Sequence, residues 1–352
     1  MLKRNAVKIW GKMLCLLVIA LLLLTGCGIL GGGGQDAPSD DSGNYAIKVG
    51  LITGQDGIED IYSEKAWEGL QKAQQELNAG IGYAKVKNDK DYPSGLAELK
   101  SQNCQVIFTI GSAAVPAALE AAEKNPKITY VCLDSAIEGT IPDNVLAVSY
   151  RVEEAAFLAG YLAANRTETN VVGFISGDNK EAAQPYFYGF KSGVRFVNPN
   201  CELLKGNAAT FTNKTRVEEM AEAMVDSDAD VIFHDAGLAG KAMIEVMEEK
   251  GKYAIGADID QNGLAPETVL TSVIKENGEV AYSIIKQIEE NTLASGKNVS
   301  YGLAENAVGL AETTESMVSE ETYTKMSEYK QKMIDGKITV PANENETFKI
   351  TY

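Results

Sequence analysis

Short apolar runs that alternate with amphipathic segments constrain the fold of this chain more than any other feature. Residues 46–53 (AIKVGLIT), 105–110 (QVIFTI) and 128–133 (ITYVCL) have the length of strands, and each run stops at a glycine or an aspartate. Residues 63–77 (SEKAWEGLQKAQQEL) follow the first run and carry apolar residues along one helical stripe. Strands and helices joined by short loops in this order predict a doubly wound α/β domain with a parallel sheet.

The same pattern starts again after residue 149. Residues 152–165 (VEEAAFLAGYLAAN) predict a strongly apolar helix, and strand-like runs follow at 170–175 and 231–234. Two series of this kind predict two α/β lobes. We assign the N-terminal lobe to residues 45–149 plus 270–298 and the C-terminal lobe to residues 150–269 plus 299–352.

The segment 253–275 (YAIGADIDQNGLAPETVLTSVIK) is expected to be a hinge. Its first strand-like run ends at Asp258 and Asp260, and its second ends at Lys275. Few residues separate the two runs, whereas a parallel crossover that carries its own helix needs roughly ten to twelve residues or more. We therefore expect the second run to leave for a different sheet, which would place two acids and a lysine between the lobes.

The N-terminus has the order of an export signal. Basic residues precede the apolar run 13–24, which is shorter than the roughly twenty residues that span a bilayer. The tetrad LTGC at 24–27 resembles the bacterial lipobox, which implies a signal peptide of residues 1–26 and lipidation of Cys27. The alternative is an ordinary cysteine in a signal. Residues 27–44 are rich in Gly, Ser, Asp and Pro and predict a flexible tether outside the cytoplasm, anchored to the cell membrane.

Composition argues against several classes of function. The net charge of −17 opposes binding to nucleic acid, whose phosphates would be repelled. The chain has one histidine, His234, which argues against catalysis by histidine and against a histidine-rich metal site. Beyond the signal region, Cys104, Cys132 and Cys201 are odd in number and widely spaced, which argues against metal binding and a disulfide framework. Cys104 and Cys132 lie beside apolar strand-like runs, and we expect them to be buried. We expect no cofactor, no metal and no catalytic residue.

Polar groups recur at one topological position, the carboxyl end of a predicted strand. They are Asp134 and the segments 54–60, 234–237 and 258–260. Loops at that edge of parallel sheets converge on one crevice, so these groups can meet. Each alone could instead cap the helix that follows it. For Asp134 and Asp258 together we favour ligand binding.

Two aromatic residues, Tyr62 and Phe211, lie in polar loops beside predicted helices and could stack on a flat ligand, although either ring alone could belong to the core. Other chemistries have weaker support. Asp258 and Asp260 could chelate Mg²⁺. His234 and Asp235 could form part of a hydrolytic relay, but no GxSxG motif accompanies them, and we favour a strand-end histidine satisfied by the backbone.

A set of motifs spread over most of the chain identifies a protein family more specifically than any single motif does. The motifs are AWEG (66–69), RVEEAAFLAGYLAA (151–164), VGFISG (172–177), YGFKSGVRFVNP (188–199), DVIFHDAG (230–237), IGADIDQ (255–261), LTSVIK (270–275) and YGLAENAVGLA (301–311). Together they resemble the basic membrane protein family, which includes the purine nucleoside receptor lipoproteins and the Med-like proteins. The resemblance implies a type I periplasmic-binding-protein fold, with two doubly wound lobes joined by three crossovers. It also implies a monomer that delivers its ligand to an ABC permease.

The resemblance also implies roles for residues. Tyr62 and Phe211 resemble the base-stacking aromatics, and Asp134 resembles the carboxylate that binds the base edge. The ribose-binding group would be Gly237, Asp258 and Lys275. Asp60 and Ser63 flank Tyr62 in the loop before the first helix, and we include them. The family commonly has Asp directly after the first strand and SFN before the helix, where this chain has GQD (54–56) and IYS (61–63).

These observations predict a membrane-anchored receptor that binds a nucleoside, most readily a purine nucleoside, between its lobes and passes it to ABC permease subunits. One alternative is a sensory or regulatory lipoprotein of Med type, which would bind a small ligand without transport. Another is a nucleoside hydrolase with a metal ion at Asp258 and Asp260.

Overall fold

The computed structural model describes residues 44–59, 61–177 and 184–351. The predicted signal peptide, Cys27 and nearly all of the predicted tether lie outside the described residues, as does Asp60. Within residues 44–351 the described strands form two six-stranded sheets and one short two-stranded sheet. No helix in the described part of the chain is both long and apolar enough to cross a membrane.

The first sheet has the strand order β11-β5-β4-β3-β1-β2, and its neighbouring strands are parallel. Its strands are β1 (Ile47–Thr53), β2 (Ala79–Lys85), β3 (Val106–Ile110), β4 (Thr129–Leu133), β5 (Val145–Tyr150) and β11 (Lys297–Tyr301). The helices on it are α2 (Ile61–Leu77), α3 (Tyr92–Ser101), α4 (Val115–Lys124) and α9 (Asn277–Glu289). Successive residues of β1 point to opposite faces: Leu51 packs in the same core cluster as α2 and α9, and Ile52 in the cluster of α3 and α4. The sheet is therefore doubly wound, as predicted.

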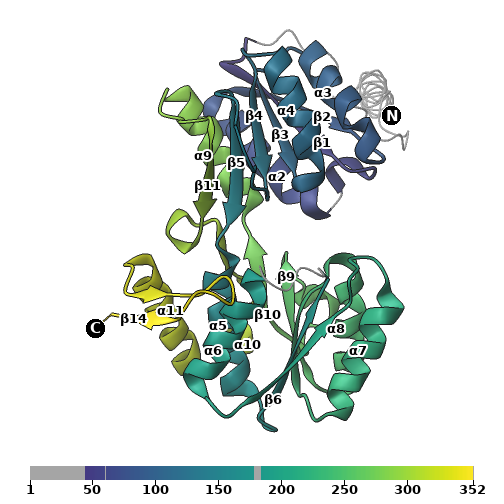
Figure 1. The fold of residues 1–352 in the computed structure, drawn as a ribbon, viewed down its shortest axis with the longest axis vertical. Helices are drawn as coiled ribbons and strands as arrows, with labels where there is room; N and C mark the ends of the chain where they lie inside the picture. The colour runs from purple at the N-terminus through teal and green to yellow at the C-terminus, as the bar shows by residue number, and fades with distance from the viewer. Residues whose placement is uncertain (1–43, 60, 178–183, 352) are drawn as a thin grey trace, which may run out of the picture. The chain divides into compact units, whose positions relative to one another are not determined.

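The second sheet has the order β12-β10-β9-β8-β6-β7. Its strands are β6 (Val171–Ser176), β7 (Glu202–Asn207), β8 (Val231–Asp235), β9 (Tyr253–Asp258), β10 (Val269–Lys275) and β12 (Val308–Leu310), the last of which is antiparallel to β10. Helices α5 (Val152–Arg166) and α6 (Pro185–Val197) share one core cluster with its strands, and α7 (Lys214–Asp226) and α8 (Gly240–Glu249) share another. The C-terminal part adds α10 (Thr314–Met317), α11 (Glu320–Ile334), β13 (Ile338–Thr339) and β14 (Lys349–Ile350). Figure 1 shows the helices beside both sheets.

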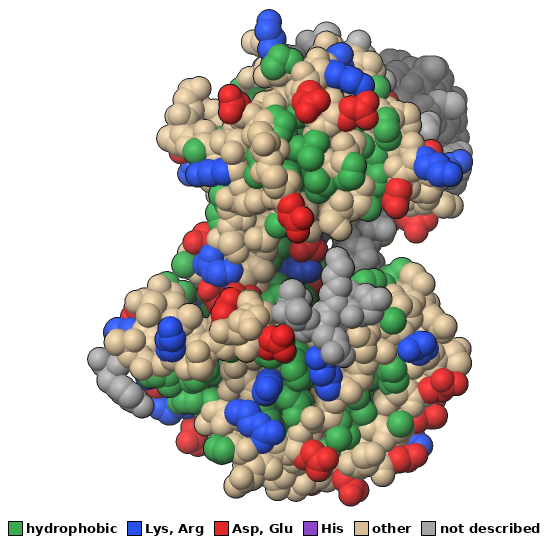
Figure 2. Space-filling view, viewed as in Figure 1, with side chains coloured by type: hydrophobic (Ala, Val, Ile, Leu, Met, Phe, Trp, Pro, Cys, Tyr) green, Lys and Arg blue, Asp and Glu red, His purple; other side chains and the backbone are tan. Residues whose placement is uncertain are grey.

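The two sheets repeat one arrangement. Strands β1, β2, β3, β4 and β5 of the first sheet occupy the places that β6, β7, β8, β9 and β10 occupy in the second. Residues that follow β4 and β9 are therefore at equivalent positions. On the face in Figure 2, acidic and basic side chains are interspersed over the surface, as is typical of solvated charges.

The predicted departure of the second hinge strand to a different sheet is wrong. Strand β10 lies beside β9, parallel to it, with Val273 opposite Ala257. The connecting residues 259–268 contain one 3₁₀ turn, Asn262–Leu264, and no α-helix. A chain of this length can extend roughly 30 Å, whereas the return along a six-residue strand needs only about 20 Å. A helix is therefore not needed to reach the start of the neighbouring strand.

This correction moves the predicted lobe boundaries. The residues 270–275, assigned above to the N-terminal lobe, belong to the second sheet, and the first sheet retains all of β11 up to Tyr301. The chain thus passes between the sheets after Tyr150, Lys275 and Tyr301. Hydrogen bonds link these three crossovers to one another. The Tyr150 hydroxyl donates to Asn277 Oδ1 at 2.6 Å, and the Arg151 N–H donates to the Tyr301 carbonyl at 2.8 Å.

Candidate ligand-binding site

Asp134 and Asp258 stand at equivalent places in the two sheets. Asp134 follows β4 and Asp258 ends β9. Both backbones are left-handed, with φ of 52° at Asp134 and 69° at Asp258. This conformation is unfavourable for residues other than glycine and is often retained at functional sites. The paired occurrence at two strand ends makes this edge of the molecule a candidate site.

Lys275 joins the two carboxylates. It ends β10, and its Nζ lies 2.9 Å from Asp134 Oδ2 and 3.2 Å from Asp258 Oδ1. The side chains of Lys275 and Asp258 are mostly buried, with 15% and 16% exposed, whereas 38% of the Asp134 side chain is exposed. The structure therefore brings together three of the residues that the sequence singled out, although they come from three strands in two sheets.

The charges in this cluster reinforce each other. Burial acts to lower the pKa of Lys275, but the carboxylates of Asp134 and Asp258 outweigh it and hold the pKa well above its ordinary value. For Asp258, burial acts to raise the pKa, while Lys275 and a hydrogen bond from Tyr186 lower it overall. Lys275 and Asp258 are thus ionised at neutral pH. Two carboxylates with one ammonium form an acceptor-rich group that suits a ligand with hydroxyl donors.

Tyr186 is a member of the cluster that the sequence analysis missed. It lies in the first turn of α6, and its hydroxyl donates to Asp258 Oδ1 at 2.7 Å. Its ring centroid is 5.5 Å from Lys275 Nζ. Burial and the Asp258 charge raise the pKa of Tyr186 well above its ordinary value, so the phenol keeps its proton. The sequence offered one signal for Tyr186, which is its position: α6 begins after the carboxyl end of β6, and the site lies at the carboxyl ends of the strands.

Phe211 presents a half-exposed ring beside this edge. It is 49% exposed, an unusual value for a large apolar side chain, and its carbonyl accepts from the Ala239 N–H at 3.0 Å. A Cβ atom at Gly177, directly after β6, would lie 2.5 Å from two ring carbons of Phe211. The glycine therefore allows the ring to lie close to the backbone. Gly237 follows β8 with a left-handed φ of 52°.

The remaining predicted residues are described only in part. Ser63 is buried in the first turns of α2, with 3% exposed. The backbone of Tyr62 lies in α2, but its side chain is outside the described residues, as is all of Asp60. The structure therefore does not place the predicted second stacking ring.

A small cavity lies at the charged cluster. Its volume is about 20 Å³, and it is lined by Lys65, Ile110, Asp134, Asp258, Ile259, Lys275 and Asn277. This volume has room for about one water-sized group. It fits a polar substituent of a ligand, such as a hydroxyl, better than a whole ring.

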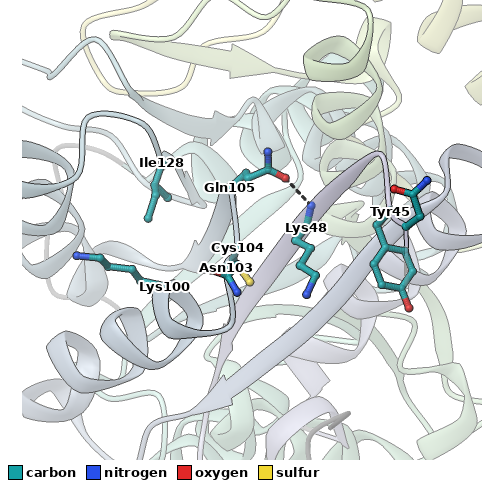
Figure 3. A pocket seen from close by; sticks show the side chains of 8 residues that line it. Tyr45, Lys48, Lys100, Asn103, Cys104, Gln105 and Ile128 are labelled. Carbon is teal, nitrogen blue, oxygen red and sulfur yellow. Dashed lines mark hydrogen bonds between the residues drawn. The ribbon is translucent and has the colours of Figure 1, made fainter. Parts of the chain in front are cut away.

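A larger cavity, of about 530 Å³, lies at the opposite end of the first sheet (Figure 3). Lys48, Lys100 and Cys104 are among its lining residues. Burial raises the pKa of the Cys104 thiol to about 11, so the thiol is unreactive at neutral pH. The lining lacks the paired carboxylates of the first site, and we do not assign a ligand to it.

The predicted relay and metal sites gain no support. His234 is 1% exposed, and burial lowers its pKa to about 4, so it is neutral. Its Nδ1 accepts the Ala236 N–H at 3.2 Å, as expected of a strand-end histidine that the backbone satisfies. Asp260 accepts a hydrogen bond from Thr313 at 2.9 Å. Among the residues that the structure describes, no three His, Cys, Asp or Glu side chains are grouped so that they could hold a metal ion.

Sequence comparisons point to one family. The family model described as Bmp, ABC transporter substrate-binding protein PnrA-like, matches residues 47–344. Basic membrane protein A of Borreliella burgdorferi is 30% identical over 338 residues, covering 95% of this chain and 96% of the relative. The CD4+ T-cell-stimulating antigen of Listeria innocua is 29% identical over 350 residues, covering 92% of this chain and 97% of the relative.

Solved structures have the same fold. A transcriptional activator of the comK gene from Bacillus halodurans superposes with a TM-score of 0.72 at 22% identity, over 82% of this chain and 97% of the other. An ABC transporter solute-binding protein from Aeropyrum pernix superposes with a TM-score of 0.69 at 22% identity, over 85% and 94%. At such identities the likeness establishes the fold alone. It confirms the predicted α/β architecture of the periplasmic-binding-protein type, with two lobes.

The family match extends from β1 to beyond β13, so it includes both sheets and every described residue of the charged cluster. The family resemblance that the motifs predicted is therefore confirmed. This chain belongs to the Bmp family of PnrA-like ABC transporter substrate-binding proteins.

Proposed function

We propose that this solute-binding protein binds a nucleoside, most readily a purine nucleoside, between its two lobes and delivers it to an ABC permease. The observation that carries the proposal is the cluster of Asp134, Asp258 and Lys275, which joins the carboxyl edges of both sheets. A carboxylate can accept hydrogen bonds from two neighbouring hydroxyls, and a lysine adds charge-assisted donors. A ribose offers the matching hydroxyls.

The site residues take the roles that the family resemblance implies. Asp258, Lys275 and Gly237 would bind the ribose, and Asp134 would accept from the edge of the base. The half-exposed Phe211 ring would stack on one face of the base, an arrangement typically worth on the order of 1 kcal/mol beyond burial. Tyr62 would cover the other face, with Asp60 and Ser63 beside it.

Binding would couple to movement about the crossovers. The ion pairs of Lys275 link Asp134, at the first sheet, to Asp258, at the second. A ligand hydroxyl that replaces part of these contacts would be held by both lobes at once. The three crossovers that connect the lobes are the natural hinge.

We infer the cellular location from the N-terminal sequence. Residues 1–26 would be removed as a signal peptide, and lipidation of Cys27 would anchor the protein to the outside of the cell membrane. Residues 28–44 would then act as a tether between the anchor and the folded body. A monomer on such a tether can meet permease subunits in the same membrane.

Calorimetry tests the nucleoside proposal. Protein comprising residues 28–352 is titrated with adenosine, guanosine, inosine, uridine and cytidine, and we expect saturable heat from at least one purine nucleoside. The variant Asp258→Asn should weaken that binding at least tenfold. Asp335→Asn, on the distant C-terminal part, is the control and should bind as the wild type does. If none of the five nucleosides binds, the nucleoside proposal is wrong, while the family and fold remain.

The two alternative functions have direct tests. Release of free base from inosine in the presence of Mg²⁺ would support a hydrolase, and we expect none. Nucleoside binding without any effect of the protein on uptake by membrane vesicles that contain the permease would support a regulatory receptor. The geometry gives no support to the hydrolase, because the residues that the structure describes provide no group of three His, Cys, Asp or Glu side chains for a metal ion.

A further inference from the structure

The turn that carries Asp258 is braced from behind by one side chain. Gln261 is buried, with 9% exposed, and its Oε1 accepts two hydrogen bonds. The Ala257 N–H donates to it at 3.0 Å, and His234 Nε2 lies 2.9 Å away. The Gln261 N–H in turn donates to Ser272 Oγ, on β10, at 3.0 Å. Gln261 thus ties the residue before Asp258 to both neighbouring strands, β8 and β10.

His234 is oriented for this contact. The Ala236 N–H donates to Nδ1, so Nδ1 carries the lone pair and the proton of the neutral ring is on Nε2. The Nε2–H therefore donates to Gln261 Oε1. A Cβ atom at Gly240 would lie between 2.0 and 2.6 Å from atoms of the imidazole ring. The bare Cα of Gly240 gives the ring its space, and any larger residue there would displace it.

The brace and the functional carboxylate belong to the same short turn. Asp258 adopts its left-handed φ of 69° between Ala257 and Ile259, and the Ile259 N–H donates to the Ala257 carbonyl at 2.9 Å. The front of the turn faces Lys275 and Tyr186, while the back faces Gln261. An unfavourable backbone conformation persists only where surrounding contacts enforce it.

We propose that Gln261 and His234 are positioning residues for ligand binding, which hold the Asp258 backbone so that its carboxylate faces Lys275 and the hydroxyls of the ligand. The ligand part of this inference rests on the proposed function. Both side chains are buried and would act through the turn without touching the ligand. Their effect would be on selectivity for hydroxyl-bearing ligands, because Asp258 is the group in the proposed site that accepts hydrogen bonds from the ribose hydroxyls, and a displaced Asp258 would lose them.

The test compares Gln261→Leu with Gln105→Leu. Leucine removes the acceptor at nearly constant volume. Gln105 is the control, because its Oε1 also accepts a backbone N–H, that of Lys48 at 3.0 Å, at the far end of the first sheet (Figure 3). Binding of adenosine and of 2′,3′-dideoxyadenosine is measured for each protein. We expect Gln261→Leu to reduce the preference for adenosine about tenfold with little change for the dideoxy compound. Gln105→Leu should leave the ratio unchanged.

Several outcomes would overturn the inference. An equal loss of affinity for both compounds in Gln261→Leu would mean general damage to the fold, and an unchanged ratio would mean no positioning. His234→Phe removes the other partner of the brace. It should shift the ratio in the same direction, and the double variant should shift it no further than Gln261→Leu alone. An additive effect in the double variant would show that the two residues do not act as a unit.

A measurement without ligand separates this inference from the proposed function. The carboxyl carbon of Asp258, assigned by comparison with Asp258→Asn, is titrated by ¹³C NMR. We expect its midpoint to rise in Gln261→Leu and to stay unchanged in Gln105→Leu. If wild type binds neither compound, the proposed function fails and this titration alone decides the inference. An unmoved midpoint in Gln261→Leu would then refute it.

Discussion

Asp134 and Asp258 occupy equivalent places in the two sheets, but the molecule supports them differently. The Asp134 side chain is 38% exposed and pairs with Lys275, and its turn is closed by Ser135 Oγ, which donates to the Cys132 carbonyl at 3.0 Å. The Asp258 side chain is 16% exposed and contacts both Lys275 and Tyr186, with Gln261 behind its turn. The second lobe therefore presents a preorganised carboxylate, whereas the first lobe presents an adaptable one.

This difference suggests that Asp258 and Asp134 have different roles in ligand binding. A rigid acid that is already paired loses little conformational entropy when a ligand arrives. An exposed acid can adjust to the part of the ligand that varies. In the proposed function, the edge with Asp258, the rigid edge, would bind the sugar, which nucleosides share. The edge with Asp134, the adaptable edge, would bind the base, in which nucleosides differ. The predictions that follow test this contrast.

The largest effect is expected from Lys275→Met. It leaves Asp258 buried without its cation, and breaking a buried ion pair in this way costs roughly 3 kcal/mol of unfolding free energy. Urea denaturation measures this loss, and calorimetry should show nucleoside affinity falling at least a hundredfold. Lys241→Met, which breaks the exposed pair between Lys241 and Glu245, should cost no more than about 0.5 kcal/mol. Equal losses of unfolding free energy in the two variants would show that burial does not increase the contribution of the Lys275 ion pairs to stability.

Replacing each acid by its amide tests the asymmetry itself. Asp258→Asn should reduce the unfolding free energy by about 2 kcal/mol, because it removes the charge that pairs with buried Lys275 and accepts from Tyr186. Asp134→Asn should reduce it by less than about 1 kcal/mol, since that side chain is more exposed. The two are compared by denaturation under identical conditions. If Asp134→Asn is the more destabilising, the contrast between the edges is wrong.

Tyr186→Phe removes one hydroxyl at the rigid edge. We expect a loss of about 1 to 2 kcal/mol in unfolding free energy, since the hydroxyl donates to a buried charged acceptor. Tyr282→Phe is the matched control. Its hydroxyl donates to Glu76 at 2.6 Å on the exposed surface, where solvent screens the contact, so Tyr282→Phe should lose less stability than Tyr186→Phe. Similar losses in both would indicate that solvent reaches Asp258 freely.

The smallest effect is a dependence on pH. The folded-state pKa of Asp258 is lowered from its ordinary value of 3.8, so the stability that its ionised form contributes is present above that value. That contribution is lost as the pH falls through the lowered pKa. The stability difference between wild type and Asp258→Asn should therefore be constant from about pH 5 to 8 and shrink in acid. A difference that grows on acidification would reverse the sign and exclude this account.

Much of the candidate site was predictable because strand ends are visible in the sequence. Asp134, Asp258 and Lys275 each end an apolar run, and the carboxyl ends of parallel strands share an edge. Tyr186 was not predicted, because its aromatic neighbours in α6 make it look like part of a core stripe. Gln261 was not predicted as a brace, because a glutamine in a loop has no distinctive local pattern. Its importance depends on His234, Ala257 and Ser272, which are contributed by three strands or their loops.

By itself, the sequence determined that the chain forms two doubly wound lobes and that its acids gather where strands end. Both follow from local periodicity and from the chirality of strand–helix–strand units. Only the tertiary structure decided that β10 pairs with β9, and that one acid is enclosed while its counterpart is exposed. Strand partners and burial depend on contacts between residues distant in the chain, which no local pattern of residues encodes.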